Sequence, residues 1–333
     1  MWDKEREIML DLVRVTESAA LAAGRFMGRG NKDLVDGAAV DAMRGMLELI
    51  NIKGTVVIGE GEKDHAPMLY IGEQLGKENC NLEADIAVDP IEGTRLVALG
   101  IPNALSIIVL AAKGALAPIP SYYMDKIIVG PQAKGCIDLN APVRENLRVV
   151  AASLGKKLED LTIVILDRPR HENLIKEVRE LGARIQLITD GDVAAGISAC
   201  LADTGVDMAI GVGGATEGVL TAVAVKCLGG EIQSRIWPRD NDEKEKILKI
   251  VNKEELSRIY TSEDLAWGNS LIFAATGITN GDLLKGVKYN GNFATTNSIV
   301  MRMATGTVRR IETIHNLNRK TIRSKKHNAE VQV

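Results

Sequence analysis

The segment Ile86-Ala87-Val88-Asp89-Pro90-Ile91-Glu92-Gly93-Thr94 decides how this chain of 333 residues is interpreted. Its first three residues are apolar and predict the end of a buried strand. Pro90 lacks a backbone N–H and fixes its own φ, so we expect the strand ladder to stop at Asp89. Gly93 permits a tight turn with positive φ. The segment therefore predicts a rigid elbow that brings two carboxylates and a hydroxyl close together.

Acidic residues at and before this elbow suggest a metal site. Asp89 and Glu92 lie three residues apart and repel each other unless a cation sits between them. Mg²⁺ and Mn²⁺ prefer such all-oxygen sites. Asp36 and Glu60 could supply ligands for a second cation, and Thr94 could orient a water if a carboxylate takes the proton. The alternative is a plain Asp-Pro turn in which Glu92 is merely solvated.

The composition excludes several classes of protein. Hydrophobic residues make up 46% and charged residues 26%, which with the length indicates a globular chain of two domains. A net charge of −3 argues against a nucleic-acid surface, and no apolar run approaches the ~18 residues of a membrane span. The charged N-terminus does not fit a secretory signal, and the four cysteines lack metal-ligand spacing. We therefore expect a cytoplasmic protein with free thiols and no membrane or nucleic-acid partner.

The histidines give no metal signal either. None has a Cys or His partner at the spacing of a zinc site, so each is expected at the surface or at a helix end. The four are His65, His171, His315 and His327.

The first half of the chain mixes helices and strands. Residues 3–28 and 37–50 have the apolar periodicity of amphipathic helices. Asp36 stands at the start of the second helix, where capping of free N–H groups is its structural alternative to metal binding. A helix is also expected from Pro67 to Leu75, and strands are expected at 55–58, 86–88, 104–111 and 124–129.

Strands and helices then alternate, which predicts parallel β-α units with helices on both faces of a sheet. We place a boundary near residue 145, so that an α+β domain at 1–145 precedes an α/β domain at 146–333. The expected helices are 140–154, 171–181, 193–201 and 217–228, and the expected strands are 161–166, 184–188, 206–212, 231–236, 271–275, 294–303 and 307–314. The basic tail 319–326 is expected to be a frayed, solvated end.

Charged residues follow the predicted strands of the second half, where ligands of α/β sheets bind. Arg168-Pro169-Arg170 offers two guanidinium forks that suit phosphate oxygens, although a solvated surface pair is the alternative. Asp190 has no evident structural duty and could accept hydrogen bonds from sugar hydroxyls. Asp192 could cap the helix that starts at Val193.

The segment Gly211–Gly218 resembles a dinucleotide-binding loop, but Thr216 stands where the third glycine of G-x-G-x-x-G belongs. A helix N-terminus behind glycines can still bind an anion. Glu217 is then either an acid facing the helix dipole or a metal ligand. A nucleotide-binding protein or dehydrogenase remains an alternative function, as does a non-catalytic sensor of metals or sugar phosphates.

Taken together, these motifs resemble the class II, bacterial-type fructose-1,6-bisphosphatases, within the superfamily of inositol and sugar phosphatases. The resemblance covers nearly the whole chain. The segments that carry it are Arg14–Ala20, Asp36–Val40, Val57–Glu62, Ala66–Tyr70, Asp89–Thr94, Asp190–Asp192 and Ala275–Thr279.

The resemblance implies a layered αβαβα fold, in which the first domain binds metal and the second binds the sugar phosphate. It implies two or more Mn²⁺ or Mg²⁺ ions, with catalysis by Asp36, Glu60 and Thr94. The implied metal ligands are Asp36, Glu60, Asp89, Glu92 and Glu217. The implied substrate-binding residues are Lys32, Glu92, Gly93, Thr94, Tyr123, Arg168, Pro169, Arg170, Asp190, Gly191, Asp192 and Gly214.

The implied reaction is hydrolysis of the 1-phosphate of fructose 1,6-bisphosphate in gluconeogenesis, by a homo-oligomer (a dimer or a tetramer). A dual enzyme that also accepts sedoheptulose 1,7-bisphosphate, or an inositol monophosphatase, is the alternative. The chain departs from the family where Arg168 replaces a frequent Lys and Thr216 a frequent Pro. The segment Pro238–Asp242 is also shorter than is usual in the family.

Overall fold

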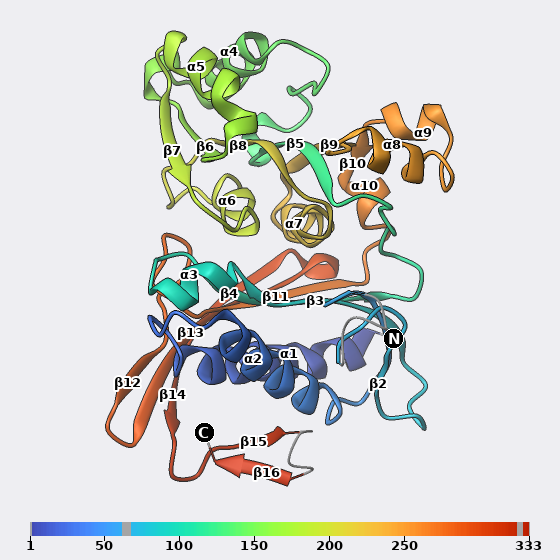
Figure 1. The fold of residues 1–333 in the computed structure, drawn as a ribbon, viewed down its shortest axis with the longest axis vertical. Coiled ribbons are helices and arrows are strands. Elements are labelled where there is room, and N and C mark those ends of the chain that lie inside the picture. Colours follow the sequence, from blue (N-terminus) through green and yellow to red (C-terminus); the bar gives the residue numbers. More distant parts are fainter. Residues whose placement is uncertain (1, 62–67, 325–328, 333) are drawn as a thin grey trace. The chain divides into compact units, whose positions relative to one another are not determined.

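The structure, a computed structural model, describes residues 2–61, 68–324 and 329–332. The chain forms two compact units, one made of Met1–Leu116 and Ser270–Val333 and the other of Ala117–Asn269. Both units combine a mixed β-sheet with helices (Figure 1). The predicted α/β class is therefore confirmed.

Eight strands of the first unit form one sheet: β1 (Lys53–Ile58), β2 (Gln74–Gly76), β3 (Glu83–Glu92), β4 (Leu105–Ala112), β11 (Leu271–Gly277), β12 (Lys288–Asn290), β13 (Phe293–Arg302) and β14 (Thr307–Asn316). Their order is β12-β13-β11-β4-β3-β1-β2, and β14 pairs with β13. β1 and β3 are parallel, whereas the other neighbours are antiparallel.

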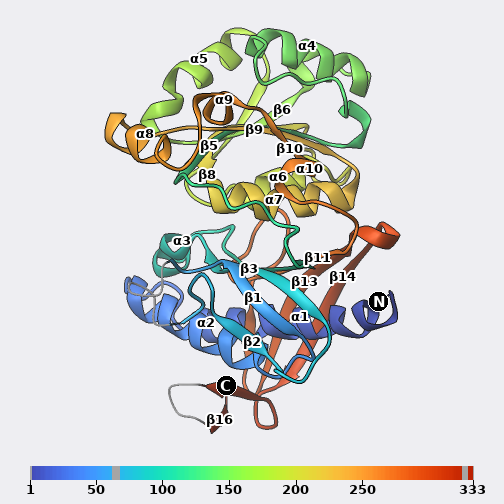
Figure 2. The same cartoon turned by 90° about the vertical axis from the view of Figure 1, so that its right-hand side faces the viewer.

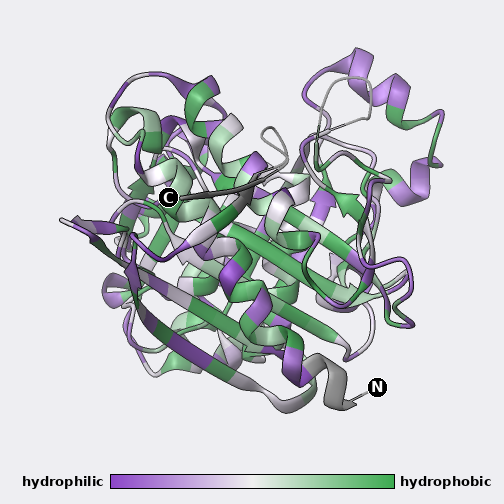
Figure 3. Ribbon diagram, turned by 90° about the horizontal axis from the view of Figure 1, so that it is seen from below, coloured by the Kyte–Doolittle hydropathy of each residue, from purple (hydrophilic) through white to green (hydrophobic). Residues whose placement is uncertain are grey.

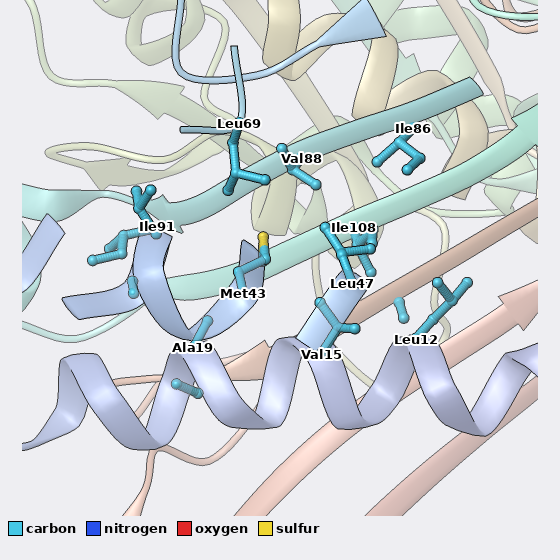
Figure 4. Packing of buried hydrophobic residues seen from close by; sticks show 14 of the residues in the cluster. Leu12, Val15, Ala19, Met43, Leu47, Leu69, Ile86, Val88, Ile91 and Ile108 are labelled. Carbon is cyan, nitrogen blue, oxygen red and sulfur yellow. The ribbon is translucent and has the colours of Figure 1, made fainter. Parts of the chain in front are cut away.

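Helices α1 (Trp2–Gly24) and α2 (Lys32–Leu47) cover one face of this sheet (Figure 1). The apolar stripe that predicts α1 is buried, including Leu12, Val15 and Ala19. These side chains pack with Met43 of α2 and Val88 of β3 in one core (Figure 4). Each large buried side chain stabilises the fold by roughly 1.5–3 kcal/mol, an upper estimate. Coloured by hydropathy, several helices carry both hydrophobic and hydrophilic residues (Figure 3).

The elbow after Val88 differs from its prediction. β3 does not stop at Asp89 but continues through Pro90 to Glu92. Its register against β4 shifts between Asp89 and Glu92, so the residue without an N–H lies in an irregular part of the ladder. Gly93 then takes a φ of 88° and starts the short helix α3 (Thr94–Leu99). The strand therefore ends three residues later than predicted, whereas the turn with positive φ lies at Gly93 as predicted.

Six strands of the second unit form its sheet: β5 (Tyr123–Val129), β6 (Thr162–Leu166), β7 (Arg184–Ile188), β8 (Met208–Gly214), β9 (Glu231–Ile236) and β10 (Tyr260–Thr261). The order is β10-β9-β5-β8-β6-β7. β6 is parallel to β7 and β8, as the alternation predicts, whereas β5 is antiparallel to β8 and β9.

Helices lie on both faces of this second sheet, as predicted. α4 (Val143–Leu154) and α5 (Glu172–Glu180) lie on one face, and α6 (Val193–Ser198) and α7 (Ala215–Leu228) lie on the other (Figures 1 and 2). The charge-rich segment after β9 forms the short helices α8 (Asn241–Ile247), α9 (Lys253–Ser257) and α10 (Ser262–Leu265).

The strand pairing within the two sheets does not separate the chain at the predicted boundary near residue 145. β5 lies before that boundary but pairs with β8 and β9 of the second unit. β11 lies far beyond it but pairs with β4 of the first unit. The chain therefore leaves the first unit near Leu116 and returns at Ser270. The order of elements along the sequence did not reveal this return, because strand pairing joins segments that are distant in sequence.

Three local predictions also fail. Residues 68–75 are not helical, since turns lead there into β2; the start of that predicted helix, Pro67, lies outside the described residues. Asp36 does not cap α2, because the helix starts at Lys32 and Asn31 accepts the capping hydrogen bond from the N–H of Leu34. The basic tail is not frayed at 321–324, where β15 (Thr321–Ser324) pairs with β16 (Ala329–Gln332).

None of the helices in the described part of the chain combines the length and the apolar character that a bilayer crossing requires. The four cysteines are free thiols, as predicted. Cys200 and Cys227 are buried, and burial raises the pKa of each thiol to about 12.

Candidate active site

Four predicted acidic residues belong to the first unit. Asp36 lies in the second turn of α2, and Glu60 follows β1. Asp89 and Glu92 lie on β3, and one carboxylate oxygen of each lies within 4.8 Å of the other. The Asp89 carboxylate also accepts a hydrogen bond from the N–H of Ile91 at 3.1 Å.

These carboxylates act on one another electrostatically. Burial, followed by the negative charges of Asp36 and Asp89, raises the pKa of Glu60 to about 8. Burial and the charge of Asp33 raise the pKa of Asp36 above its usual value. Glu60 also keeps contact with water, which partly screens these charges. Burial and neighbouring negative charges both disfavour ionised carboxylates here, and a divalent cation would offset both effects.

The end of β3 positions the predicted hydroxyl. Thr94 is the first residue of α3, and its hydroxyl donates to the carbonyl of Ile91 at 3.4 Å. Gly93 has a positive φ, which residues with a side chain rarely adopt, and a Cβ there would lie 2.8 Å from the Leu96 side chain. A glycine is therefore required at this position. Lys32 is the exposed first residue of α2. A catalytic role for Thr94 together with Asp36 stays a prediction.

In the second unit, Arg168 and Asp190 form an ion pair. An Nη of Arg168 lies 2.5 Å from the Asp190 carboxylate, joining the ends of β6 and β7. The interpretation of Asp190 as a residue without a structural duty is therefore wrong. This pair presents the Arg168 guanidinium in a fixed orientation after β6, which a pair of solvated arginines would not do.

Arg170 is held by two different contacts. Its guanidinium donates twice to the carbonyl of Val212, at 2.9 and 3.2 Å. It also lies over the ring of Tyr123, 4.9 Å from the ring centroid. Tyr123 in turn meets Trp237 edge-on, with ring centroids 6.2 Å apart. The structure thus brings together Tyr123 and Arg170, which are distant in sequence.

Asp192 is held by a lysine that the sequence analysis missed. Lys126 is buried on β5, and its Nζ lies 2.5 Å from Asp192 and 3.0 Å from the carbonyl of Gly214. The Asp192 side chain makes no capping hydrogen bond to α6, so the capping interpretation is wrong. A cation in the apolar strand Met124–Val129 was the signal for this residue, because a buried lysine needs acceptors.

His171 is a further structural residue of the second unit and lies at a helix end, as predicted, since it directly precedes α5. It is 2% exposed, with Nδ1 2.7 Å from the carbonyl of Leu166, and its Nε2 accepts the N–H of Val212 at 2.7 Å. Burial lowers its pKa, which agrees with the neutral ring that these contacts need. His315 is also buried rather than at the surface, whereas His65 and His327 lie outside the described residues.

Three glycines of the predicted loop Gly211–Gly218 lie in a strand and not in a loop. Gly211, Gly213 and Gly214 belong to β8, and α7 begins directly at Ala215. A Cβ on Gly213 would lie 1.8 Å from the Asp192 carboxylate, and one on Gly214 would lie 1.8 Å from that of Glu217. These glycines therefore make room for carboxylates. This explanation removes the main support for a dinucleotide-binding loop.

Glu217 lies in the first turn of α7 and accepts a hydrogen bond from the Thr216 hydroxyl at 2.6 Å. A carboxylate in the first turn is stabilised by the helix dipole. Its predicted role as a metal ligand with Asp89 and Glu92 stays a prediction.

Comparison with known proteins identifies the family. Residues 6–315 match the model of the family described as bacterial fructose-1,6-bisphosphatase, glpX-encoded. The chain belongs to this family. It is 49% identical, over 95% of its length and 97% of theirs, to fructose-1,6-bisphosphatase 1 class 2 of Escherichia coli strain K12 and to the class 2 enzymes of Escherichia coli O6:H1 and Shigella flexneri.

The match to this bacterial fructose-1,6-bisphosphatase family extends over both units. It includes the four predicted acidic site residues of the first unit and the ion pairs at the strand ends of the second. The resemblance expected from short motifs is thereby confirmed as family membership.

Proposed function

We propose that this protein hydrolyses the 1-phosphate of fructose 1,6-bisphosphate and releases fructose 6-phosphate and phosphate, as a step of gluconeogenesis. Family membership and the names of the class 2 relatives support this reaction. The observation that carries it is the partly buried carboxylate of Glu60, whose pKa is raised by burial and by the nearby charges of Asp36 and Asp89, an arrangement that suits a divalent cation.

We assign to the cations the ligands that the family resemblance implies. Asp36 and Glu60 would hold one ion, and Asp89, Glu92 and Glu217 a second, with Mn²⁺ or Mg²⁺ as the metal. A divalent cation there would supply positive charge to stabilise the phosphate oxygens during transfer.

The residues of the chain itself would orient and deprotonate the attacking water. Thr94 would hold the water by its hydroxyl, and Asp36 would accept the proton. Lys32 would lie near the phosphate that is transferred.

The second phosphate would be held by guanidinium groups. Arg170 lies over Tyr123 and Arg168 is paired to Asp190, so both groups are oriented before substrate binds. Two forks of this kind suit a phosphate that stays on the sugar. The remaining proposed contacts are Glu92, Gly93, Thr94, Pro169, Gly191, Asp192 and Gly214.

Further parts of the proposal rest on the resemblance alone. These are the membership of the inositol and sugar phosphatase superfamily with its layered αβαβα fold, a dimeric or tetrameric assembly, and a cytoplasmic location. A dual activity toward sedoheptulose 1,7-bisphosphate is the second candidate. The paired arginines argue against an inositol monophosphatase, because a monophosphate has no second phosphate to bind.

The test is phosphate release from a panel of substrates with Mg²⁺ or Mn²⁺. Fructose 1,6-bisphosphate, sedoheptulose 1,7-bisphosphate, fructose 1-phosphate and inositol 1-phosphate distinguish the candidates, and a chelated sample is the control. We expect turnover of fructose 1,6-bisphosphate that the chelator removes. An absence of phosphate release from that substrate with either ion would refute the proposal.

A further inference from the structure

A second cationic region lies in the first unit, on residues that the proposed chemistry does not use. A cavity of about 360 Å³ opens between the start of α1 and the strands β13 and β14. This volume is in the range of small-molecule pockets. Its lining includes the side chains of Arg6, Arg302 and Arg309, and among the described residues that line it none carries a carboxylate.

The strand register explains why the arginines meet there. Arg302 pairs with Thr307 across the β13–β14 ladder, and Val300 pairs with Arg309, so these four side chains share one face. Arg302 is only 2% exposed and makes further interactions within the protein, which fixes it at the floor of the cavity. Arg6 and Arg309 are exposed and form the rim.

The cavity also offers neutral donors and an apolar wall. The hydroxyl of Thr307 donates to that of Thr305 at 2.8 Å, and both residues line the cavity. Met9 and Leu10 of α1 and Val300 of β13 line the cavity with apolar side chains, and Leu10 is exposed. Guanidinium forks bind tetrahedral anions with strong, charge-assisted hydrogen bonds.

We propose that this cavity is a binding site for a small phosphate- or phosphonate-type dianion with a compact apolar group. The site is separate from the proposed catalytic residues, none of which lines it. Its binding test is therefore independent of the proposed phosphatase activity.

Phenylphosphonate is a suitable probe, because it carries both parts of the ligand and has no phosphate ester to hydrolyse. The experiment labels the arginines of the full chain, with Mg²⁺ present, using phenylglyoxal, and maps the labelled residues by mass spectrometry. We expect the probe to protect Arg6 and Arg309. Arg310 is the internal control, because it is exposed and pairs with Ile299 on the opposite face of the ladder.

Calorimetry on variants gives an independent measurement. R6Q/R309Q should weaken phenylphosphonate binding by roughly tenfold, since two charge-assisted contacts are lost, whereas R310Q should leave it unchanged. Inorganic phosphate used in place of phenylphosphonate shows whether the apolar group contributes to affinity. Equal protection of Arg310 and Arg309, or equal affinity of R6Q/R309Q and the parent protein, would overturn the site.

Discussion

The predicted site residues of the two units differ in how their charges are balanced. In the first unit, burial and then the charges of neighbouring carboxylates raise the pKa values of Asp36 and Glu60. In the second unit, Asp190 is paired with Arg168, and Asp192 with Lys126. The first group therefore gains most from an added cation, whereas the second is oriented before any ligand binds. Four predictions test this contrast, from the largest expected effect to the smallest.

The largest effect should follow from removing a carboxylate of the first unit. Asp36→Ala or Glu92→Ala should abolish phosphate release, because each would take a proposed ligand from the cation. The fold should remain, as judged by circular dichroism and thermal unfolding, and Asp36→Ala should not lower the stability of the chelated protein. Glu7→Ala in α1 is the matched control, since Glu7 is exposed and has no proposed role. Full activity of either site variant would contradict the assignment.

In the second unit, Lys126→Met should lower the free energy of unfolding, unlike the variants of the first unit. Loss of one partner from a buried ion pair costs about 3–5 kcal/mol, because the other charge stays buried without its partner. Denaturant unfolding measures this change. The double variant K126M/D192N should recover much of the lost stability. Its KM for fructose 1,6-bisphosphate should nevertheless exceed that of the parent protein, since Asp192 is a proposed substrate contact. An unchanged stability of K126M would show that its ion pair with Asp192 does not support the unit.

Arg170→Lys should raise KM for fructose 1,6-bisphosphate by about tenfold with a smaller effect on kcat. Lysine keeps the charge but loses the fork that donates to Val212 and the planar contact with Tyr123. Steady-state kinetics give both constants. Arg148→Lys, at an exposed position of α4, is the control and should leave both constants unchanged.

The smallest effect concerns pH and stability without metal. Because the folded pKa of Glu60 is raised to about 8 from an ordinary value near 4.5, the stability linked to this group is present below pH 4.5 and is lost as pH rises toward 8. Thermal unfolding of the chelated protein should show this decline, and Glu60→Gln should reduce it. Saturating Mg²⁺ should also reduce it, since a cation offsets the repulsion. If Glu60→Gln lost stability with rising pH to the same extent, groups other than Glu60 would be the cause.

Prediction from sequence succeeded where the signal is local. The periodicity of α1 and α2, the apolar runs of β4 and β6, and the alternation of strands and helices after residue 160 all match the structure. It failed at Asp36, because Asn31, five residues earlier, caps the helix instead, and at 68–75, where turns replace the expected helix. Boundaries of this kind depend on which of several possible caps and turns the packed chain selects.

The sequence by itself determined the family, the α/β class and the acidic elbow at Asp89–Glu92, because these depend on residue type and on spacing along the chain. Only the tertiary structure decided that β11 to β14 return to the first sheet and that Lys126 and His171 support the strand ends of the second. Hydrogen bonds and ion pairs of this kind act over a few ångströms of space. Their partners are separated by tens of residues or more, so no local pattern in the sequence specifies them.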